Sequence, residues 1–240
     1  MDIKDISPDQ VVYFSLGPFD LNATIAYTWG VMALIVLVSI IVTSRMTASE
    51  DMSRWQNFLE IVVDFLRRQI ADISGEKPEL YMPYIGTLFV FIAVCNLLSV
   101  VPGFLPPTAS LSTTAALAIT VFMAVIIFGV IKRGPLGYLR QYVKPTPMML
   151  PFNIMGEFSR TLALAVRLFG NIMSGVKIVA ILLAIAPLVF PVLMNALGLL
   201  TGMIQAYIFA VLAMVYIASA TRIERERHEK TQTTQGDSDG

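Results

Sequence analysis

The sequence predicts an all-α polytopic membrane protein with about five membrane helices and one interfacial amphipathic helix. Of its 240 residues, 56% are apolar and only 14% are charged, whereas about 25% of a typical soluble domain is charged. No charged residue occurs in the 52 positions of Leu80–Ile131 or in the 44 positions of Ile178–Thr221. Both stretches far exceed the roughly 20 residues that a helix needs to cross a bilayer, and with a mean hydropathy of +0.71 they argue against a water-soluble fold.

The composition also excludes several classes of function. The single cysteine, Cys95, and the single histidine, His228, allow no internal disulfide and argue against a Cys/His metal site. The sequence contains no Gly-Lys-Ser or Gly-Lys-Thr phosphate loop, so the chain has no obvious means of holding a nucleotide. We therefore expect no cofactor and no metal, and the zero net charge predicts no nucleic-acid partner.

The first elements are a polar lead-in and a membrane span. Residues 1–20 carry one lysine and four aspartates and lack the basic start of a secretory signal, so we expect a retained external segment. Residues 21–44 are uncharged and rich in Ile, Val and Leu, which predicts the first span. Residues 53–75 place apolar side chains at helical spacing opposite charged ones, as in a helix that lies in the membrane interface.

Two further pairs of spans follow. Prolines and a glycine between residues 102 and 107 divide the long uncharged run into spans at 80–101 and 111–131, because proline breaks helical hydrogen bonding. A basic loop at 132–150 leads to two long helices at 152–186 and 188–220. The first would be about 52 Å long against a bilayer core of about 30 Å, so it must be strongly tilted, bent or partly outside the core. Of these arrangements we expect a long, tilted hairpin of the last two helices.

Five crossings place the two ends of this single membrane domain, residues 1–240, on opposite sides of the membrane. The loops at 45–77 and 132–144 hold five and four Lys or Arg residues, and the polar, disordered tail at 221–240 holds four. The other ends hold only Lys4. Because basic residues accumulate on the cytoplasmic side, we expect an external N-terminus and a cytoplasmic C-terminus.

The first long helix carries charges within its apolar sequence. Ionisable groups inside a membrane are costly, which makes a functional role the default hypothesis. Arg167 cannot lose its proton and acts as a fixed charge whose carboxylate partner we expect on another subunit. Glu157 and Arg160 are also compatible with a structural i,i+3 ion pair, and Lys177 with snorkelling to the interface. Small residues that would admit another helix, or pack within the chain, are Gly156, Ala163, Gly170, Ser174, Gly198 and Gly202.

Three motifs resemble subunit a of F-type ATP synthases. Arg-Leu-Phe-Gly-Asn at Arg167–Asn171 looks like the signature of that family. IQAYIFAVLAMVYIASA around Gln205 is similar to its final helix, and NLLSVVPGFLPPTASLSTTAALA at Asn96–Ala118 is similar to its central hairpin. The resemblance covers roughly residues 22–220 in consistent order.

The resemblance implies an ion-translocating stator in the F0 sector of a bacterial inner (plasma) membrane. In that family the arginine matching Arg167 faces a ring of c subunits, drives each ring carboxylate to release H⁺ or Na⁺, and separates two half-channels. Asn171 and Gln205 match positions on the ion pathway, and Glu157 and Arg160 join them as candidates. Implied partners are the c ring, the subunit b stalk and the rest of the F1F0 complex, in which this chain binds no nucleotide; whether the lone chain is an enzyme stays open.

The sequence departs from the family at the outer half-channel. Val176 and Gly198 stand where the family usually has a Glu or His, and Ser110 stands where it commonly has an Asp. The candidates for lining this half-channel differently are therefore Lys177, Ser110, water and the N-terminal region. The pattern suggests a divergent branch, such as the N-type ATPases that are proposed to export ions.

Two other hypotheses remain at this stage. A stand-alone secondary transporter would use Glu157, Arg160 and Arg167 to bind its substrate, and would transport when purified alone. A structural membrane-assembly subunit would need the same charges only for pairing, so neutralising Arg167 would change the yield of the complex and not its turnover.

Overall fold

In the part of the chain that the structure describes, six long helices follow one another in the order predicted. The computed structural model describes residues 12–16, 19–44, 54–75, 77–101, 104, 106–143, 148, 150–185 and 190–221. The helices are α1 (Ala23–Ser44), α2 (Arg54–Ser74), α3 (Met82–Leu98), α4 (Leu111–Val143), α5 (Leu150–Ile185) and α6 (Phe190–Thr221), with 3₁₀ helices η3 (Pro78–Leu80) and η4 (Pro107–Ala109).

Four of these helices, α1, α4, α5 and α6, are long and apolar enough to cross a membrane, which confirms a polytopic membrane protein. The remaining predicted span, at 80–101, corresponds to α3, which is apolar but has only 17 residues. At 1.5 Å per residue α3 is about 26 Å long, near the lower end of the range for a membrane-spanning helix.

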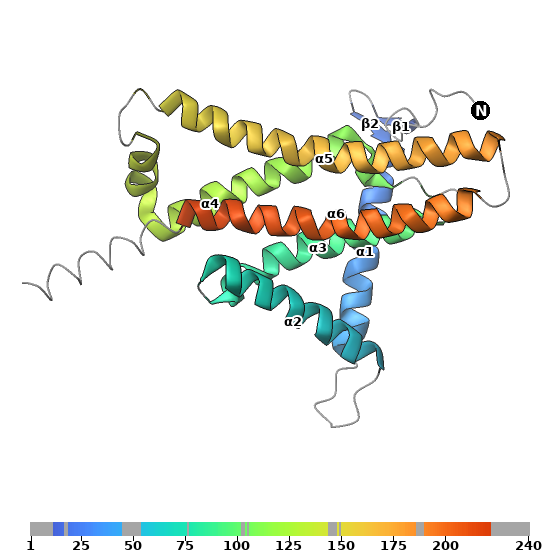
Figure 1. Cartoon of the computed structure of the whole chain (residues 1–240), viewed down its shortest axis with the longest axis horizontal. Helices are drawn as coiled ribbons and strands as arrows, with labels where there is room; N and C mark the ends of the chain where they lie inside the picture. The colour runs from blue at the N-terminus through green and yellow to red at the C-terminus, as the bar shows by residue number, and fades with distance from the viewer. Residues whose placement is uncertain are drawn as a thin grey trace, which may run out of the picture.

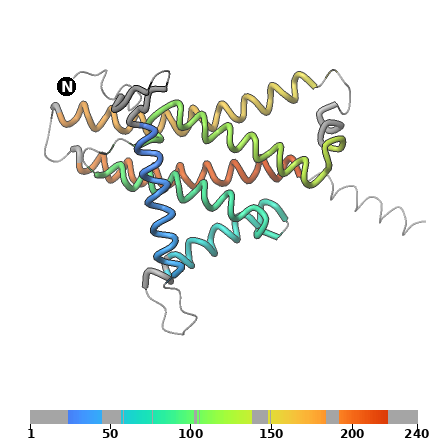
Figure 2. Tube along the Cα trace, turned by 180° about the vertical axis from the view of Figure 1, so that it is seen from behind, coloured from blue at the N-terminus to red at the C-terminus, as the bar shows by residue number. Residues whose placement is uncertain are grey.

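The last two helices form the long hairpin that was predicted. Figures 1 and 2 show α5 and α6 side by side, with α3 and α4 packed against them and α1 running steeply across the group. The 22 residues of α1 measure about 33 Å, close to the thickness of a bilayer core. The 36 residues of α5 measure about 54 Å, so a bilayer that α1 crosses directly leaves α5 strongly tilted.

The core lies where α3, α4, α5 and α6 meet. Ile92, Val121, Leu168 and Phe209 come from these four helices and are at most 1% exposed. On α6 the buried face contains several alanines, whose small side chains let neighbouring backbones approach. The buried residues of this face are Ala206, Phe209, Ala210, Ala213, Met214 and Ile217.

Helix α2 has the amphipathic division that its sequence predicts. Leu66 and Ile70 are buried, whereas Arg67 and Arg68 are exposed. The Tyr207 hydroxyl of α6 donates a hydrogen bond to Gln69 Oε1 over 2.9 Å. The amphipathic helix is therefore attached to α6.

Two segments differ from the expected pattern. The segment predicted as a polar lead-in contains an antiparallel pair of strands, β1 (Val12–Leu16) and β2 (Phe19–Asn22). Helix α4 continues to Val143 through the region expected as a basic loop, with a break where Gly134 has φ +73° and Pro135 follows. Glycine tolerates positive φ and proline suits the start of a helical segment, so helix resumes after the break. Residues 222–240 of the predicted tail lie outside the described residues.

Candidate functional site

One face of α5 carries an exposed stripe of charged and small residues. Its members are alternately four and three residues apart, which keeps them on one side of a helix. Glycines in the stripe leave open space, since a Cβ added at Gly156 or Gly170 would meet nothing within 4 Å. Apart from the half-buried Gly156 all its members are exposed, and we call this set the α5 stripe: Gly156, Arg160, Ala163, Arg167, Gly170, Ser174 and Lys177.

Arg167 lies at the middle of the α5 stripe. The neighbouring face of the helix holds Leu164 and Leu168, which are 1% and 0% exposed and anchor α5 to the core. Arg167 is exposed and makes no ion pair or hydrogen bond with any residue that the structure describes. The fold thus holds an obligatory positive charge outward with no acidic partner in the described part of the chain.

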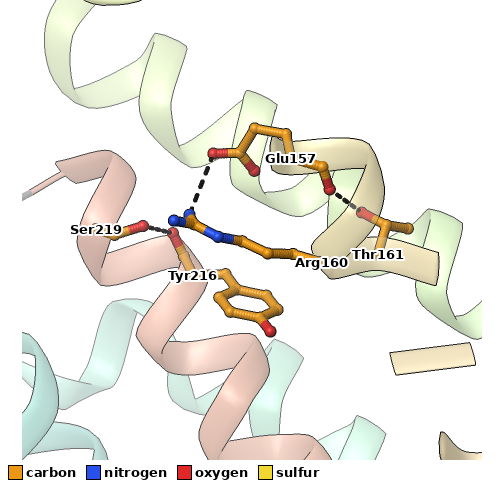
Figure 3. Close-up of polar contacts among 5 residues, drawn as sticks. All are labelled: Glu157, Arg160, Thr161, Tyr216 and Ser219. Atoms are coloured by element: carbon orange, nitrogen blue, oxygen red, sulfur yellow. Dashed lines mark hydrogen bonds and ion pairs between the residues drawn. The ribbon is translucent and has the colours of Figure 1, made fainter. Parts of the chain in front are cut away.

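Glu157 and Arg160 form the i,i+3 ion pair that was one of the two interpretations. Arg160 Nη1 lies 3.6 Å from Glu157 Oε1, and its guanidinium lies 5.8 Å from the centre of the Tyr216 ring on α6. Figure 3 shows Arg160 reaching from α5 to α6 between these two partners. A guanidinium over an aromatic face is a favourable cation–π contact, so this cluster connects the two long helices.

The other predicted site residues lie in three different environments. Asn171 is half-buried on α5, one turn after Arg167, and Lys177 is exposed at the end of the α5 stripe. Gln205 is only 6% exposed, and its Nε2 has no hydrogen-bond partner in the described structure. Asn171 and Lys177 are thus near Arg167 along one helix, while Gln205 faces the interior of the chain.

Ser110 makes the contacts of a helix cap. It is 0% exposed, and its Oγ accepts a hydrogen bond of 3.2 Å from the backbone N–H of Ser112, in the first turn of α4. Its carbonyl accepts a bond of the same length from the N–H of Thr114. This geometry is that of an N-cap, which stabilises a helix by satisfying its first free N–H groups.

A cavity of about 160 Å³ opens between α3, α5 and α6, and its described lining contains both polar and apolar residues but no charged one. It has room for several water molecules, because a water occupies about 30 Å³ in the liquid. Val176 and Gly198, the two positions at which the resemblance led us to expect a Glu or His, contribute to its walls. We call it the amide cavity after its polar lining residues, Asn96, Ser99, Asn171, Asn195 and Thr201.

Asn96 and Gly202 hold α3 against α6 beside the amide cavity. Asn96 is 3% exposed and donates a hydrogen bond of 2.7 Å from Nδ2 to the carbonyl oxygen of Gly202. A Cβ added at Gly202 would lie only 2.9 Å from Asn96 Cγ. The glycine is therefore required for a contact within the chain, which was one of its two interpretations.

Comparison with known proteins identifies the family. The family model described as ATP synthase A chain matches residues 25–218. The chain is 59% identical over 217 residues to ATP synthase subunit a 1 of Chlorobaculum parvum, covering 90% of this chain and 96% of that protein. It is 57% identical over 224 residues to ATP synthase subunit a 2 of Acaryochloris marina, covering 93% and 96%.

The chain belongs to the ATP synthase subunit a family. Subunit a is the ion-translocating stator of the membrane sector and has no nucleotide-binding role. A further relative, ATP synthase subunit a of Albidiferax ferrireducens, is 54% identical over 93% of this chain and 97% of its own length. Membership favours the stator hypothesis and gives no support to the stand-alone transporter or the assembly subunit.

Sequence reasoning alone missed several residues that line the amide cavity, and it missed the contact of Arg160 with the Tyr216 ring. Asn96 and Asn195 are polar residues inside otherwise apolar spans, a signal that points to a function or to pairing within a membrane. Tyr216 has no comparable signal, because an aromatic residue in a subunit a helix also suits the core.

Proposed function

We propose that this subunit a presents Arg167 to the carboxylates of a ring of c subunits, and that the α5 stripe is the surface along which the ring moves. The exposed Arg167 with no acidic partner among the described residues carries this proposal. An unpaired charge inside a membrane is costly, and a carboxylate supplied by another subunit compensates it.

The chemistry follows from the permanent charge of arginine. A ring carboxylate that approaches Arg167 is stabilised in its ionised form, because an opposite charge lowers the pKa of a carboxyl group, and it releases its H⁺ or Na⁺. The same positive charge repels a cation that would pass straight from one half-channel to the other. The open glycines of the α5 stripe support close approach of a ring helix.

The proposal includes an orientation and further partners. The basic loops and tail favour a cytoplasmic C-terminus and an external N-terminus, in a bacterial inner membrane. The subunit b stalk and the remaining F1F0 subunits hold the chain still while the ring turns. The further residues that we place along the ion pathway are Asn171, Gln205, Glu157, Arg160, Lys177 and Ser110.

Arg167→Ala tests the mechanism. We expect loss of coupled transport with the complex still assembled, because the substitution removes a charge and leaves the buried side of α5 intact. Arg167→Lys should fail as well, since an ammonium lacks the planar donor fork and can lose its proton when buried. Sealed vesicles that contain the complex are energised with ATP while lumen acidification and sodium uptake are recorded in parallel, and a blot reports assembly.

Arg68→Ala provides the matched control. Arg68 is an exposed arginine on α2 whose guanidinium lies 2.7 Å from Asp64, and an exposed ion pair of this kind contributes little to stability. Transport by the control should equal that of the wild type, and the trace that disappears in Arg167→Ala names the ion. ATP-driven transport that persists in Arg167→Ala would refute the mechanism and leave Arg160 and Lys177 as the charges of the α5 stripe.

A further inference from the structure

Gln205 has a buried amide whose donor group is held by no hydrogen bond within the described structure. The side chain is 6% exposed, and its Nε2 has no partner among the described residues. A buried donor without a partner costs free energy in a folded protein, and such exceptions point to a bound water or to a role in function. The direction of this amide therefore depends on how the backbone of α6 is held around residue 205.

A contact with α2 holds α6 two residues after Gln205. The Tyr207 hydroxyl donates a hydrogen bond of 2.9 Å to Gln69 Oε1, and the centroid of the Tyr207 ring lies 5.6 Å from that of the Phe65 ring. Phe65 and Gln69 are four residues apart and lie on one side of α2. Tyr207 thus contacts two successive turns of α2.

The α2 side of this contact is itself held in place. Leu66 and Ile70, which precede and follow Gln69 by three residues and one residue, are both buried. Arg67 forms an ion pair with Glu79 of η3, which connects α2 to the segment before α3. Gln69 is therefore an acceptor on a supported helix, as a positioning contact requires.

A second contact holds α6 three residues before Gln205. Asn96 of α3 donates its 2.7 Å bond to the carbonyl oxygen of Gly202. Residues 202 and 207 are five positions apart, so they lie about 140° from each other around the helix axis. Because the two contacts come from different helices and different directions, a rotation of α6 at Gln205 disturbs both of them.

We propose that Gln69 and Tyr207 are positioning residues of this stator, and that the bond between them sets the rotation of α6 that directs the Gln205 amide toward the ion pathway. This inference rests on the proposed function, which places Gln205 on that pathway. We assign neither Gln69 nor Tyr207 a contact with the ion, since both act through the amide of Gln205.

Gln69→Leu and Tyr207→Phe test the bond, because they remove its acceptor and its donor with little change in side-chain volume. In sealed vesicles that contain the complete complex, the rate of ATP-driven transport is divided by the amount of assembled subunit a. We expect each variant to lower this rate by about twofold to tenfold, the fold-change equivalent to one net hydrogen bond. The double variant should lose no more than either single variant, because both remove the same bond. Losses that multiply in the double variant would overturn the inference.

Gln69→Glu is the conservative variant of this series. Its carboxylate keeps an acceptor oxygen for the Tyr207 hydroxyl, so the transport rate per assembled complex should equal that of the wild type. A loss as large as that of Gln69→Leu would contradict the role of the acceptor.

Leu66→Ala is the structural control. It shortens a buried side chain of the same helix and leaves the bond between Gln69 and Tyr207 in place. We expect less assembled subunit a, because truncating a buried leucine destabilises a protein, with an unchanged transport rate per assembled complex. If this rate falls as far as in Gln69→Leu, the packing of α2 is responsible and the bond has no positioning role.

Gln205→Asn tests whether the bond acts through the amide. The substitution keeps the amide group and shortens its reach by one carbon atom. We expect Gln69→Leu to lower the transport rate by a smaller factor in Gln205→Asn than in the wild type, since the amide is already displaced there. A merely structural effect of Gln69→Leu lowers the rate by the same factor in both backgrounds, and that result would exclude positioning through Gln205.

The two levels of the proposal fail separately. If Arg167→Ala abolishes transport while the Gln69 and Tyr207 variants transport at the wild-type rate, the stator mechanism stands and the bond to α2 is structural only. If Arg167→Ala retains transport, the mechanism itself fails, whatever the Gln69 and Tyr207 variants do.

Discussion

Gly202 is a residue at which one added carbon atom has a measurable cost. Gly202→Ala would place its Cβ 2.9 Å from Asn96 Cγ, well inside normal contact, so α3 and α6 must separate or the amide must turn away. We expect the free energy of unfolding to fall by about 1–3 kcal/mol, as is typical for overpacking a well-packed core. This loss of stability is measured by heating the complex and recording how much subunit a remains assembled at each temperature.

The control for that substitution is Gly30→Ala, on an exposed helix surface with nothing within 4 Å. It should be neutral or slightly stabilising, because alanine favours helix over glycine. Equal stability of the two variants would show that the Asn96 side chain can move aside at little cost. The contact between α3 and α6 would then contribute little to stability.

At the scale of elements, Tyr216 connects α6 to α5 through Arg160. Tyr216→Leu removes the ring beneath the guanidinium, which lies 5.8 Å from its centre, and should cost about 0.5–1 kcal/mol, the range for a partly exposed cation–π contact. Tyr216→Phe keeps the ring and should retain most of the stability. Thermal unfolding of both variants distinguishes a ring contact from a requirement for the hydroxyl, which would make the two variants equally unstable.

The stability of the junction between α2 and η3 depends on pH, and the direction of this dependence can be stated. A hydrogen bond from its own backbone N–H, and then that from Arg67, hold the pKa of the Glu79 carboxyl below its ordinary value of 4.5. A lowered pKa stabilises the folded form above the ordinary value, and this contribution is lost as the pH falls through the folded-state pKa. The effect is small, because both side chains of the pair are 57% exposed.

Hydrogen exchange at the end of α2 measures this effect. After correction for intrinsic exchange, we expect wild-type protection to fall as the pH drops below 4.5. Glu79→Gln should show slightly lower protection at neutral pH and no such decline. A decline of the same size in the Gln variant would assign it to another group.

At the scale of the whole molecule, the proposed orientation predicts from which side of the membrane each end of the chain is accessible. A protease site added after Gly240 should be cut only from the cytoplasmic side, and a site added before Met1 only from outside. The physical reason is the concentration of Lys and Arg in the two loops and the tail. Right-side-out and inverted vesicles supply the two sides, and cleavage of both sites from one side would imply an even number of crossings.

The sequence predicts the bounds of the long helices well and makes Arg167 stand out as a candidate. It predicts the contacts between helices poorly. Length and hydropathy locate α5 and α6 to within two residues, and Arg167 is conspicuous because a charge in an apolar run is costly. The bond from Asn96 to Gly202 joins residues 106 apart, and no periodicity along one helix specifies such a pair. Ser110 was a candidate for the outer half-channel because it stands where the resembling family commonly has an Asp, whereas its capping contacts require knowing where α4 begins.

The spacing of the α5 stripe also gives the surface a handedness. An alternation of four and three residues averages 3.5 per turn, while a straight helix has 3.6, so such a row drifts by about 20° per heptad. From Gly156 to Lys177 the row completes three heptads, a winding of about 60° with Arg167 near its midpoint. The two ends of the row turn to opposite sides of the helix by about 30° each. In the proposed function, the ring that moves along this row therefore meets side chains whose directions change in one sense during clockwise rotation and in the opposite sense during anticlockwise rotation.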